Sequence, residues 1–213
     1  MTIKIRNLNK RIKNNILFEN LNFDLIPGEI YGIIGKNGTG KTTLLKLLSG
    51  LVPDDRKQTI DLFPDQYSPI GIHLENPKIY PYLSGKQNIR LFTSDLLEPY
   101  YDADLLIKKF QLEKFIDKKV KTYSLGTKQK ISLIIAILMS GKLLLLDEPT
   151  NGLDEESIKT FKSILLQLSK EYKLTILITT HDVHELEEVF DKMMTIKNGS
   201  LETVDLPARK KHV

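Results

Sequence analysis

The chain of 213 residues contains no cysteine, and this absence excludes disulfides and every metal site that depends on thiolates. The redox state of a compartment therefore places no constraint on where the protein works. Long hydrophobic runs are also absent. The longest apolar stretch, Ile131–Met139, is interrupted by Ser132 and is much shorter than the roughly 20 residues of a membrane-spanning helix. We expect no part of this sequence to cross a bilayer by itself.

The first residues lack the apolar core of a secretion signal, because Lys4 and Arg6 place charges where such a signal is hydrophobic. We therefore expect the chain to stay in the cytosol. Positive charge is in small excess, since 31 Lys and Arg residues face 27 Asp and Glu residues, which gives a net charge of +4. This balance suits polyanions such as nucleotide phosphates or anionic lipid headgroups, and it does not single out nucleic acid. The length favours one α/β domain with lobes.

A glycine-rich segment between a predicted strand and a predicted helix fits the P-loop pattern for binding phosphate. The strand is Ile30–Ile34, and Thr42–Leu51 is the predicted helix. Glycines let the backbone approach phosphate, Lys41 reaches the β- and γ-phosphates, and the Thr42 hydroxyl suits Mg²⁺. The predicted nucleotide contacts are Gly35, Lys36, Asn37, Gly38, Thr39, Gly40, Lys41, Thr42 and Thr43. A glycine turn without nucleotide is the alternative, and the following helix argues against it.

A run of four leucines, Leu143–Leu146, ends in two adjacent carboxylates. The run predicts a buried strand that would deliver Asp147 and Glu148 to a phosphate site. Asp147 would hold Mg²⁺ through water, and Glu148 would orient or deprotonate the attacking water. Two solvated acids at a strand end are the alternative, which the burial of the preceding leucines disfavours. Together with the P-loop, this pair predicts an ATPase.

The remaining pattern alternates strands with helices. Strands are expected at Ile3–Leu8 and Ile16–Leu25, and a helical lobe is expected from about Pro77 to Ser140, with one helix over Ala103–Phe115. The later elements are expected to be a helix over Glu155–Tyr172, a strand over Leu174–Thr180, a helix from Asp182, a hairpin turn at Asn198–Gly199 and a frayed tail from Ala208.

With these motifs in place, the chain resembles the nucleotide-binding subunit of ABC transporters over nearly its full length. Tyr123–Lys130 is similar to the family signature, Leu-Ser-Gly-Gly-Gln followed by a basic stretch. Glu75 stands where the family usually has the Q-loop glutamine, Asp154 matches the D-loop aspartate, and His181 matches the switch histidine. The resemblance implies an ABC-type P-loop NTPase fold: a mainly parallel central sheet, an antiparallel β subdomain and an inserted α-helical subdomain at about 77–140, within one domain spanning 1–213.

The resemblance also implies the role of each site residue. Glu148, His181 and Lys41 would be catalytic, and Thr42, Glu75 and Asp147 would lie at Mg²⁺. In this family the signature acts on ATP bound to another subunit. Ser124, Gly126 and Asp154 would therefore contact nucleotide in a dimer, formed either by two copies or by this chain and a related ATPase. Two alternatives are a structural role for His181 and a simple helix N-cap for Ser124. No role is assigned to His73, His184 or His212.

Several positions depart from the family pattern. Leu125 and Thr127 replace the first glycine and the glutamine of the signature, so weaker nucleotide-driven dimerisation is expected. Glu75 adds a negative charge near Glu148, and we expect activity to depend more strongly on Mg²⁺ than with glutamine. Ile12 replaces the aromatic residue that usually stacks on adenine, which predicts modest discrimination between ATP and GTP unless Phe18 substitutes for it.

The Ser-Leu-Gly form of the signature, followed by Lys-Gln-Lys, resembles the bacitracin and lantibiotic resistance exporters, and so does Ile70–Pro77. The resemblance implies an ATP-hydrolysing subunit of an exporter, peripheral on the inner face of the cell membrane and coupled to an integral membrane permease. Tyr80 and Tyr82 would either contact that permease or lie in the core of the helical lobe.

Two other classes of protein fit the sequence less well. A soluble ABC ATPase acting on ribosomes or DNA would carry two such domains or a long coiled coil, and this sequence has neither. A P-loop kinase seldom carries a signature element, and a GTPase would need the guanine-reading Asn-Lys-x-Asp motif, which is absent. We therefore expect no nucleic acid partner.

Overall fold

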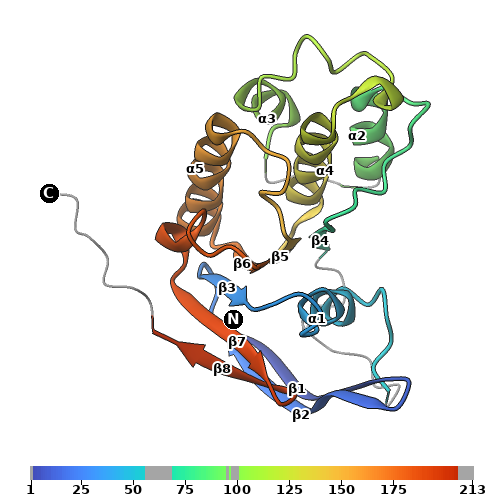
Figure 1. Cartoon of the computed structure of the whole chain (residues 1–213). Coiled ribbons are helices and arrows are strands. Elements are labelled where there is room, and N and C mark those ends of the chain that lie inside the picture. Colours follow the sequence, from blue (N-terminus) through green and yellow to red (C-terminus); the bar gives the residue numbers. More distant parts are fainter. Residues whose placement is uncertain (1, 56–68, 95, 97–100, 206–213) are drawn as a thin grey trace, which may run out of the picture.

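Two sheets and the helices around them form the computed structural model, which describes residues 2–55, 69–94, 96 and 101–205 (Figure 1). The larger sheet has six strands in the order β4-β5-β6-β3-β7-β8. Every neighbouring pair is parallel except β7 and β8. The strands are β3 (Ile30–Ile34), β4 (Ile70–His73), β5 (Leu143–Asp147), β6 (Thr175–Thr180), β7 (Lys192–Lys197) and β8 (Ser200–Val204).

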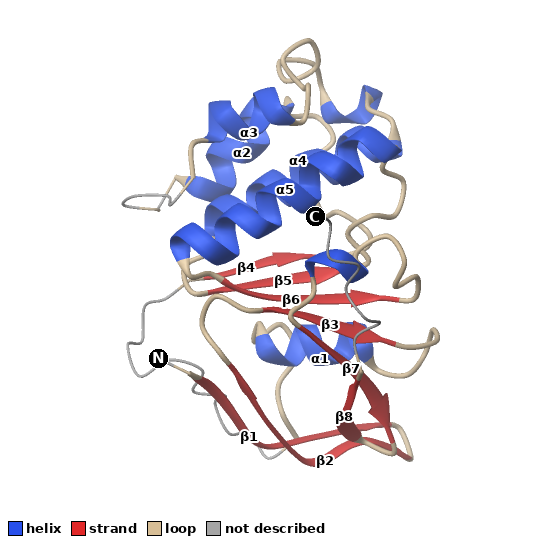
Figure 2. Ribbon diagram, turned by 90° about the vertical axis from the view of Figure 1, so that its left-hand side faces the viewer, coloured by secondary structure: helices blue, strands red, loops and turns tan. Residues whose placement is uncertain are grey.

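The central strands are buried on both faces because helices cover the two sides of the sheet. Figure 2 shows α4 (Leu125–Met139) and α5 (Glu155–Tyr172) on one face, and α1 (Lys41–Leu48) on the other. Alternate leucines of β5 therefore enter different cores: Leu144 and Leu146 pack with α4 and α5, whereas Leu143 and Leu145 pack with α1. The predicted mainly parallel sheet is confirmed.

A separate antiparallel sheet is made by β1 (Ile3–Ile12) and β2 (Asn15–Leu25). It lies beyond α1, at the opposite end of the molecule from most of the helices (Figure 1). The predicted end of the first strand was too early, because β1 continues past Leu8 and Ile12 still pairs with Asn15. This extension carries Ile12 towards the glycine-rich loop.

Helices α2 (Gly85–Thr93) and α3 (Ala103–Lys109) lie beside α4, on the side of the large sheet away from β1 and β2 (Figure 2). A short 3₁₀ helix, Val120–Thr122, precedes α4. The predicted helix over Ala103–Phe115 was too long. It ends at Lys109 because Gln111 adopts a left-handed conformation with a φ of 56°, which a continuing helix does not allow.

The predicted helix from Asp182 was wrong, since this segment forms turns and then a 3₁₀ helix, Glu187–Val189. Here polar side chains accept hydrogen bonds from backbone amides, and these bonds compete with those of a helix. Thr180 Oγ1 accepts from the amide of Asp182 at 3.1 Å, and Asp182 Oδ1 accepts from the amide of His184 at 3.1 Å. The helix predicted over Glu155–Tyr172 and the hairpin turn at Asn198–Gly199 are confirmed.

Strand β4 was not predicted from the sequence, and it packs unusually closely on α4. A Cβ atom on Gly71 would overlap the carbonyl oxygen of Ala136 and lie 2.9 Å from the Cβ of Ser140. His73, in the same strand, is completely buried, and its Nδ1 lies 2.8 Å from Ser132 Oγ. Burial lowers the pKa of His73 to about 3, so the imidazole is neutral in this core.

Among the helices of the described residues, none combines the length and the hydrophobicity that a bilayer span requires. The tail predicted to fray, from Ala208, lies outside the described residues.

Candidate functional site

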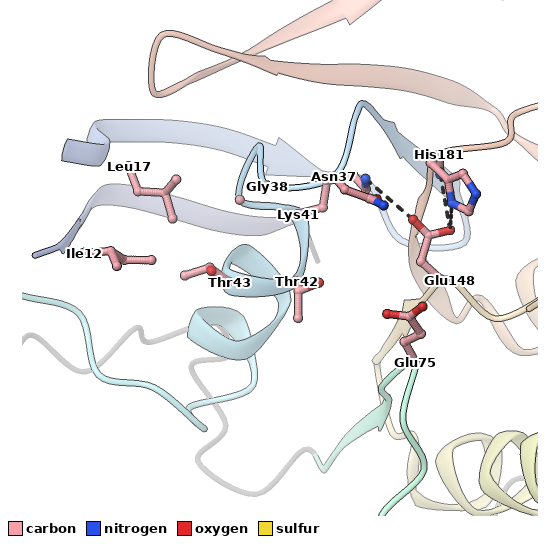
Figure 3. A pocket seen from close by; sticks show the side chains of 11 residues that line it. Ile12, Leu17, Asn37, Gly38, Lys41, Thr42, Thr43, Glu75, Glu148 and His181 are labelled. Atoms are coloured by element: carbon pink, nitrogen blue, oxygen red, sulfur yellow. Dashed lines mark hydrogen bonds and ion pairs between the residues drawn. The ribbon is translucent and has the colours of Figure 1, made fainter. Parts of the chain in front are cut away.

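A cavity of about 310 Å³ opens where the carboxyl ends of the parallel strands meet the glycine-rich loop (Figure 3). Such a strand edge is where open α/β sheets generally bind their ligands. One end of the cavity is apolar and the other carries charged side chains (Figure 3). The lining residues are Ile12, Leu17, Asn37, Gly38, Gly40, Lys41, Thr42, Thr43, Glu75, Glu148 and His181.

The glycine-rich loop joins β3 to α1 and turns sharply just before the helix. Gly40, the N-cap of α1, has a φ of 104°, a conformation that side chains other than glycine rarely adopt. Lys41 Nζ donates to the carbonyls of Gly35 at 2.6 Å and Lys36 at 3.3 Å, while Thr39 Oγ1 donates to the Lys36 carbonyl at 3.0 Å. The first amides of α1 and the Lys41 ammonium thus give the loop a positive field suited to phosphate.

Asp147 ends β5 and is buried against two hydroxyl groups. Thr42 Oγ1 donates to its two oxygens at 3.0 and 2.8 Å, and Thr179 Oγ1, on the neighbouring β6, donates at 2.6 Å. A carboxylate and a hydroxyl are the hard oxygen donors that Mg²⁺ prefers. Within the described residues, no three acidic, histidine or cysteine side chains gather into a metal site. This donor set fits Mg²⁺, which usually takes few protein ligands and completes its shell with water and phosphate.

Glu148 lies between two cationic or potentially cationic groups at the charged end of the cavity. His181 Nδ1 is 2.8 Å from Oε2, and the His181 amide donates to the same oxygen at 3.2 Å. Lys41 Nζ lies 3.6 Å from Oε1. Within the described part of the chain, Oε1 is buried and receives no hydrogen bond. One oxygen is therefore anchored by His181, and the other faces the Lys41 ammonium without a hydrogen bond.

The backbone at Glu148 has a φ of 47°, which is uncommon for a residue other than glycine. It is maintained by the amide of Glu148, which donates to the carbonyl of Thr179 at 2.9 Å. Such strained residues cluster at functional sites. Here the turn directs the carboxylate away from the strand and towards the loop.

Ile12 and Leu17, from the hairpin of β1 and β2, form the apolar end of the cavity (Figure 3). Leu17 is not predictable from the sequence, because only the folded hairpin brings it against Gly40. Phe18, the alternative to Ile12 as the residue that stacks on the base, is buried in the core at 1% exposure. That alternative is wrong, since Phe18 faces the other side of the strand from Leu17.

Several predicted site residues are not among those that line the cavity, namely Gly35, Lys36, Thr39, Ser124, Gly126, Asp147 and Asp154. Ser124 Oγ accepts from the Thr127 amide at 3.2 Å and caps α4, and Asp154 Oδ1 accepts from the Ser157 amide at 2.8 Å and caps α5. Hydrogen bonds from Ser157, followed by the charge of Lys130, hold the pKa of Asp154 below its usual value. Gly126 packs on the turn after β5, where a Cβ atom would lie 2.5 Å from the Gly152 carbonyl oxygen. The contact of Ser124, Gly126 and Asp154 with nucleotide in a partner subunit stays a prediction.

The profile of the family described as ABC transporter matches residues 18–151. The chain is 36% identical to the uncharacterized ABC transporter ATP-binding protein YybJ of Bacillus subtilis, over 98% of this chain and 99% of YybJ. It is 34% identical to the lantibiotic transport ATP-binding protein SrtF of Streptococcus pyogenes, over 93% of this chain and 88% of SrtF. It is also 32% identical to the bacitracin transport ATP-binding protein BcrA of Bacillus licheniformis, over 93% of this chain and 68% of BcrA.

The fold is similar to that of the solved dimeric structure of MJ0796, a bacterial ABC transporter cassette. The TM-score is 0.82 at 23% sequence identity, over 97% of this chain and 99% of that chain. The predicted fold class and the resemblance to bacitracin and lantibiotic transport ATPases are thereby confirmed. The chain belongs to the ABC transporter family, as an ATP-binding subunit with ATPase activity.

Proposed function

We propose that this chain powers an ABC exporter by binding and hydrolysing MgATP, as one half of a dimer attached to a separate integral membrane permease. The proposal rests on one observation: Glu148 lies close to both Lys41 and His181 in the cavity beside the glycine-rich loop. The similarity to SrtF and BcrA supports export, because those proteins are named for transport of a lantibiotic and of bacitracin. The whole chain, 1–213, would act as one nucleotide-binding domain with its helical subdomain at about 77–140.

In this mechanism the loop amides and the Lys41 ammonium bind the phosphates of ATP and stabilise the negative charge that develops on them. Asn37, Gly38, Thr39 and Thr43 complete the cradle around the phosphates. Thr42, Asp147 and Glu75 are the residues that would hold Mg²⁺, which neutralises phosphate charge and orients the γ-phosphate when bound. The anchored Glu148 accepts the proton of the attacking water through Oε1, and His181 keeps the carboxylate oriented while contacting the γ-phosphate.

Ser124, Gly126 and Asp154 would complete the site of a second subunit, which is either another copy or a related ATPase. The exposed position of Ser124, at the N-terminus of the 15-residue helix α4, supports this role because the helix dipole there favours an anion. The same hydroxyl can cap the helix and meet a phosphate. Closure of the dimer and its reopening after hydrolysis would be transmitted to the permease from the cytoplasmic side of the membrane.

Purification from native membranes tests the proposal as a whole. A tagged chain is expected to retain a polytopic membrane protein after solubilisation in detergent, and the complex is expected to hydrolyse ATP faster than the chain alone. The partner would be identified by mass spectrometry. Recovery of ribosomal or DNA-bound material without any membrane protein would instead favour the soluble class of ABC ATPase.

Tyr82 is the residue we expect to contribute most to contact with the permease. It is 72% exposed, with Lys121 Nζ 5.5 Å from the centre of its ring, whereas Tyr80 is 53% exposed and packs on Phe92. The idea that both tyrosines lie in the core of the helical lobe is therefore wrong. Exposed aromatic residues on a rigid support are typical anchors of protein interfaces.

Replacing Tyr82→Ala is expected to reduce the permease recovered with the tagged chain by about tenfold, the effect of losing one interface anchor. The ATPase rate of the isolated chain should not change, because Tyr82 lies outside the cavity. Tyr172→Ala, which removes a partly exposed tyrosine from the end of α5, is the matched control. Equal recovery with both variants would exclude Tyr82 from the interface.

Ile12 predicts weak selection between bases, because an aliphatic side chain offers apolar contact and no aromatic face. It is 47% exposed at the apolar end of the cavity, beside Leu17. We expect competition binding to give dissociation constants for ATP and GTP within about threefold of each other, and Ile12→Tyr to tighten both by about three- to tenfold through stacking. A large preference of the unmodified chain for ATP would show that another residue reads the base.

A further inference from the structure

Glu75 is held from two sides by residues of two other elements, and the sequence signalled neither contact. Gln129 Nε2, on α4, donates to the backbone carbonyl of Glu75 at 2.8 Å. Asn151 Nδ2, in the turn after β5, donates to Glu75 Oε1 at 3.2 Å. The first bond fixes where the backbone of Glu75 lies relative to α4, and the second fixes the direction of its carboxylate.

Asn151 is also bonded to Glu148, the second carboxylate of the cavity. The amide of Asn151 donates to the carbonyl of Glu148 at 3.2 Å, which closes the turn that follows β5. One residue therefore contacts the backbone of Glu148 and the side chain of Glu75. Both carboxylates line the cavity, and Figure 3 shows them at its charged end. Asn151 thus connects the backbone of one acid to the carboxylate of the other.

The chemistry of this contact matters because an amide orients a carboxylate without neutralising it. Lys41 and His181 both lie close to Glu148. By contrast, no ion pair involving Glu75 occurs in the described part of the chain, so its negative charge is not compensated by a cationic side chain. An oriented and uncompensated carboxylate beside another acid attracts a cation. Residues that hold such ligands through hydrogen bonds commonly set metal affinity.

We propose that Asn151 is a positioning residue that orients Glu75 and thereby raises the affinity of the nucleotide-bound chain for Mg²⁺. The inference rests on the proposed function, in which Glu75 lies on the metal side of ATP. It assigns to the turn after β5 a task separate from that of Asp154, which caps α5 through Ser157. It also explains how Glu75 can occupy a position usually held by a glutamine. The side-chain amide of Asn151 supplies the hydrogen-bond donor that a glutamate lacks.

The test measures metal binding directly and does not depend on turnover. Mn²⁺ is titrated into the full-length chain saturated with a non-hydrolysable ATP analogue, and free Mn²⁺ is read from its electron paramagnetic resonance signal. Asn151→Ala is expected to weaken Mn²⁺ binding by about tenfold, the low end for loss of a residue that supports a ligand. Affinity for the analogue without metal should stay the same. In a Glu75→Gln background, the same substitution should change Mn²⁺ binding by about twofold or less.

Two further variants make the result decisive. Asn151→Ser removes the side-chain amide but keeps a residue that favours turns, so it tests the contact even if the alanine variant folds poorly. It must weaken Mn²⁺ binding as much as Asn151→Ala does. Asn76→Ala removes an exposed amide next to Glu75 and should have no effect. Equal losses with and without Glu75, or no loss at all, would overturn the inference. If the unmodified chain binds the analogue but no Mn²⁺ at the site, the magnesium part of the proposed function fails as well.

Discussion

Replacing Glu148→Gln is expected to lower kcat for ATP hydrolysis by about 10²- to 10⁴-fold, the usual contribution of a general base. Glutamine has nearly the same shape, but its amide cannot accept the proton of the attacking water. In the proposed mechanism this task falls to the buried Oε1, which receives no hydrogen bond among the described residues. The rate of phosphate release from the purified chain, alone and with its permease, measures the effect.

ATP affinity should survive in the same variant, because the proposed phosphate contacts come mainly from the loop amides and Lys41. Retained binding without turnover should also trap dimers, which size-exclusion chromatography with ATP would detect. The matched control is Glu155→Gln, which alters an exposed pair with Lys159 in the first turn of α5 and should leave kcat unchanged. Full activity of the Glu148→Gln chain would refute the role of Glu148 as the base.

Adding one methyl group at Gly71 is expected to have the largest effect on stability. The new Cβ would overlap the carbonyl oxygen of Ala136, a backbone atom that no change of rotamer can remove, and would crowd Ser140. Either β4 or α4 must move, so Gly71→Ala should lower the free energy of unfolding by about 3 kcal/mol, the upper part of the range for overpacking. The Tm should fall by about 6–12 °C for a chain of this size, which differential scanning calorimetry can measure.

Gly50→Ala separates steric overlap from a general effect of losing glycine. No atom lies within 4 Å of a Cβ atom placed there, and the strain comes only from its φ of 75°. The expected cost is about 1 kcal/mol. If both variants melt at the same temperature, the close contact between β4 and α4 does not limit stability.

Elements whose signal is local were predictable from the sequence. The leucine run of β5 predicts a buried strand, and α5 carries its own start signal, because Asp154 caps the helix and two acidic residues occupy its first turn. The predicted helix after Thr180 failed because side-chain bonds within Thr180–His184 compete with the helical backbone. Strand β4 was missed because it is only four residues long and contains Gly71.

The residues of the candidate site also differ in whether a local sequence pattern reveals them. The glycine-rich loop and the pair Asp147–Glu148 are continuous in sequence, so their spacing revealed them. Leu17 reaches the cavity only through folding of the hairpin, and the contact of Asn151 with Glu75 forms only through tertiary packing. Their residue types carry no signal for phosphate or metal, and only the three-dimensional arrangement identifies them.

The order of strands in the large sheet has a consequence for how the protein is made. Strand β3, which leads into the phosphate loop, is flanked by β6 and β7, so Ile30 pairs with Ile176 and Tyr31 pairs with Lys192. During synthesis, β3 stays unpaired until β6 and β7 have emerged from the ribosome. Pairing over such a separation also makes folding slow. A translation product ending before β6 would therefore present β3 to chaperones as an apolar strand without its neighbours.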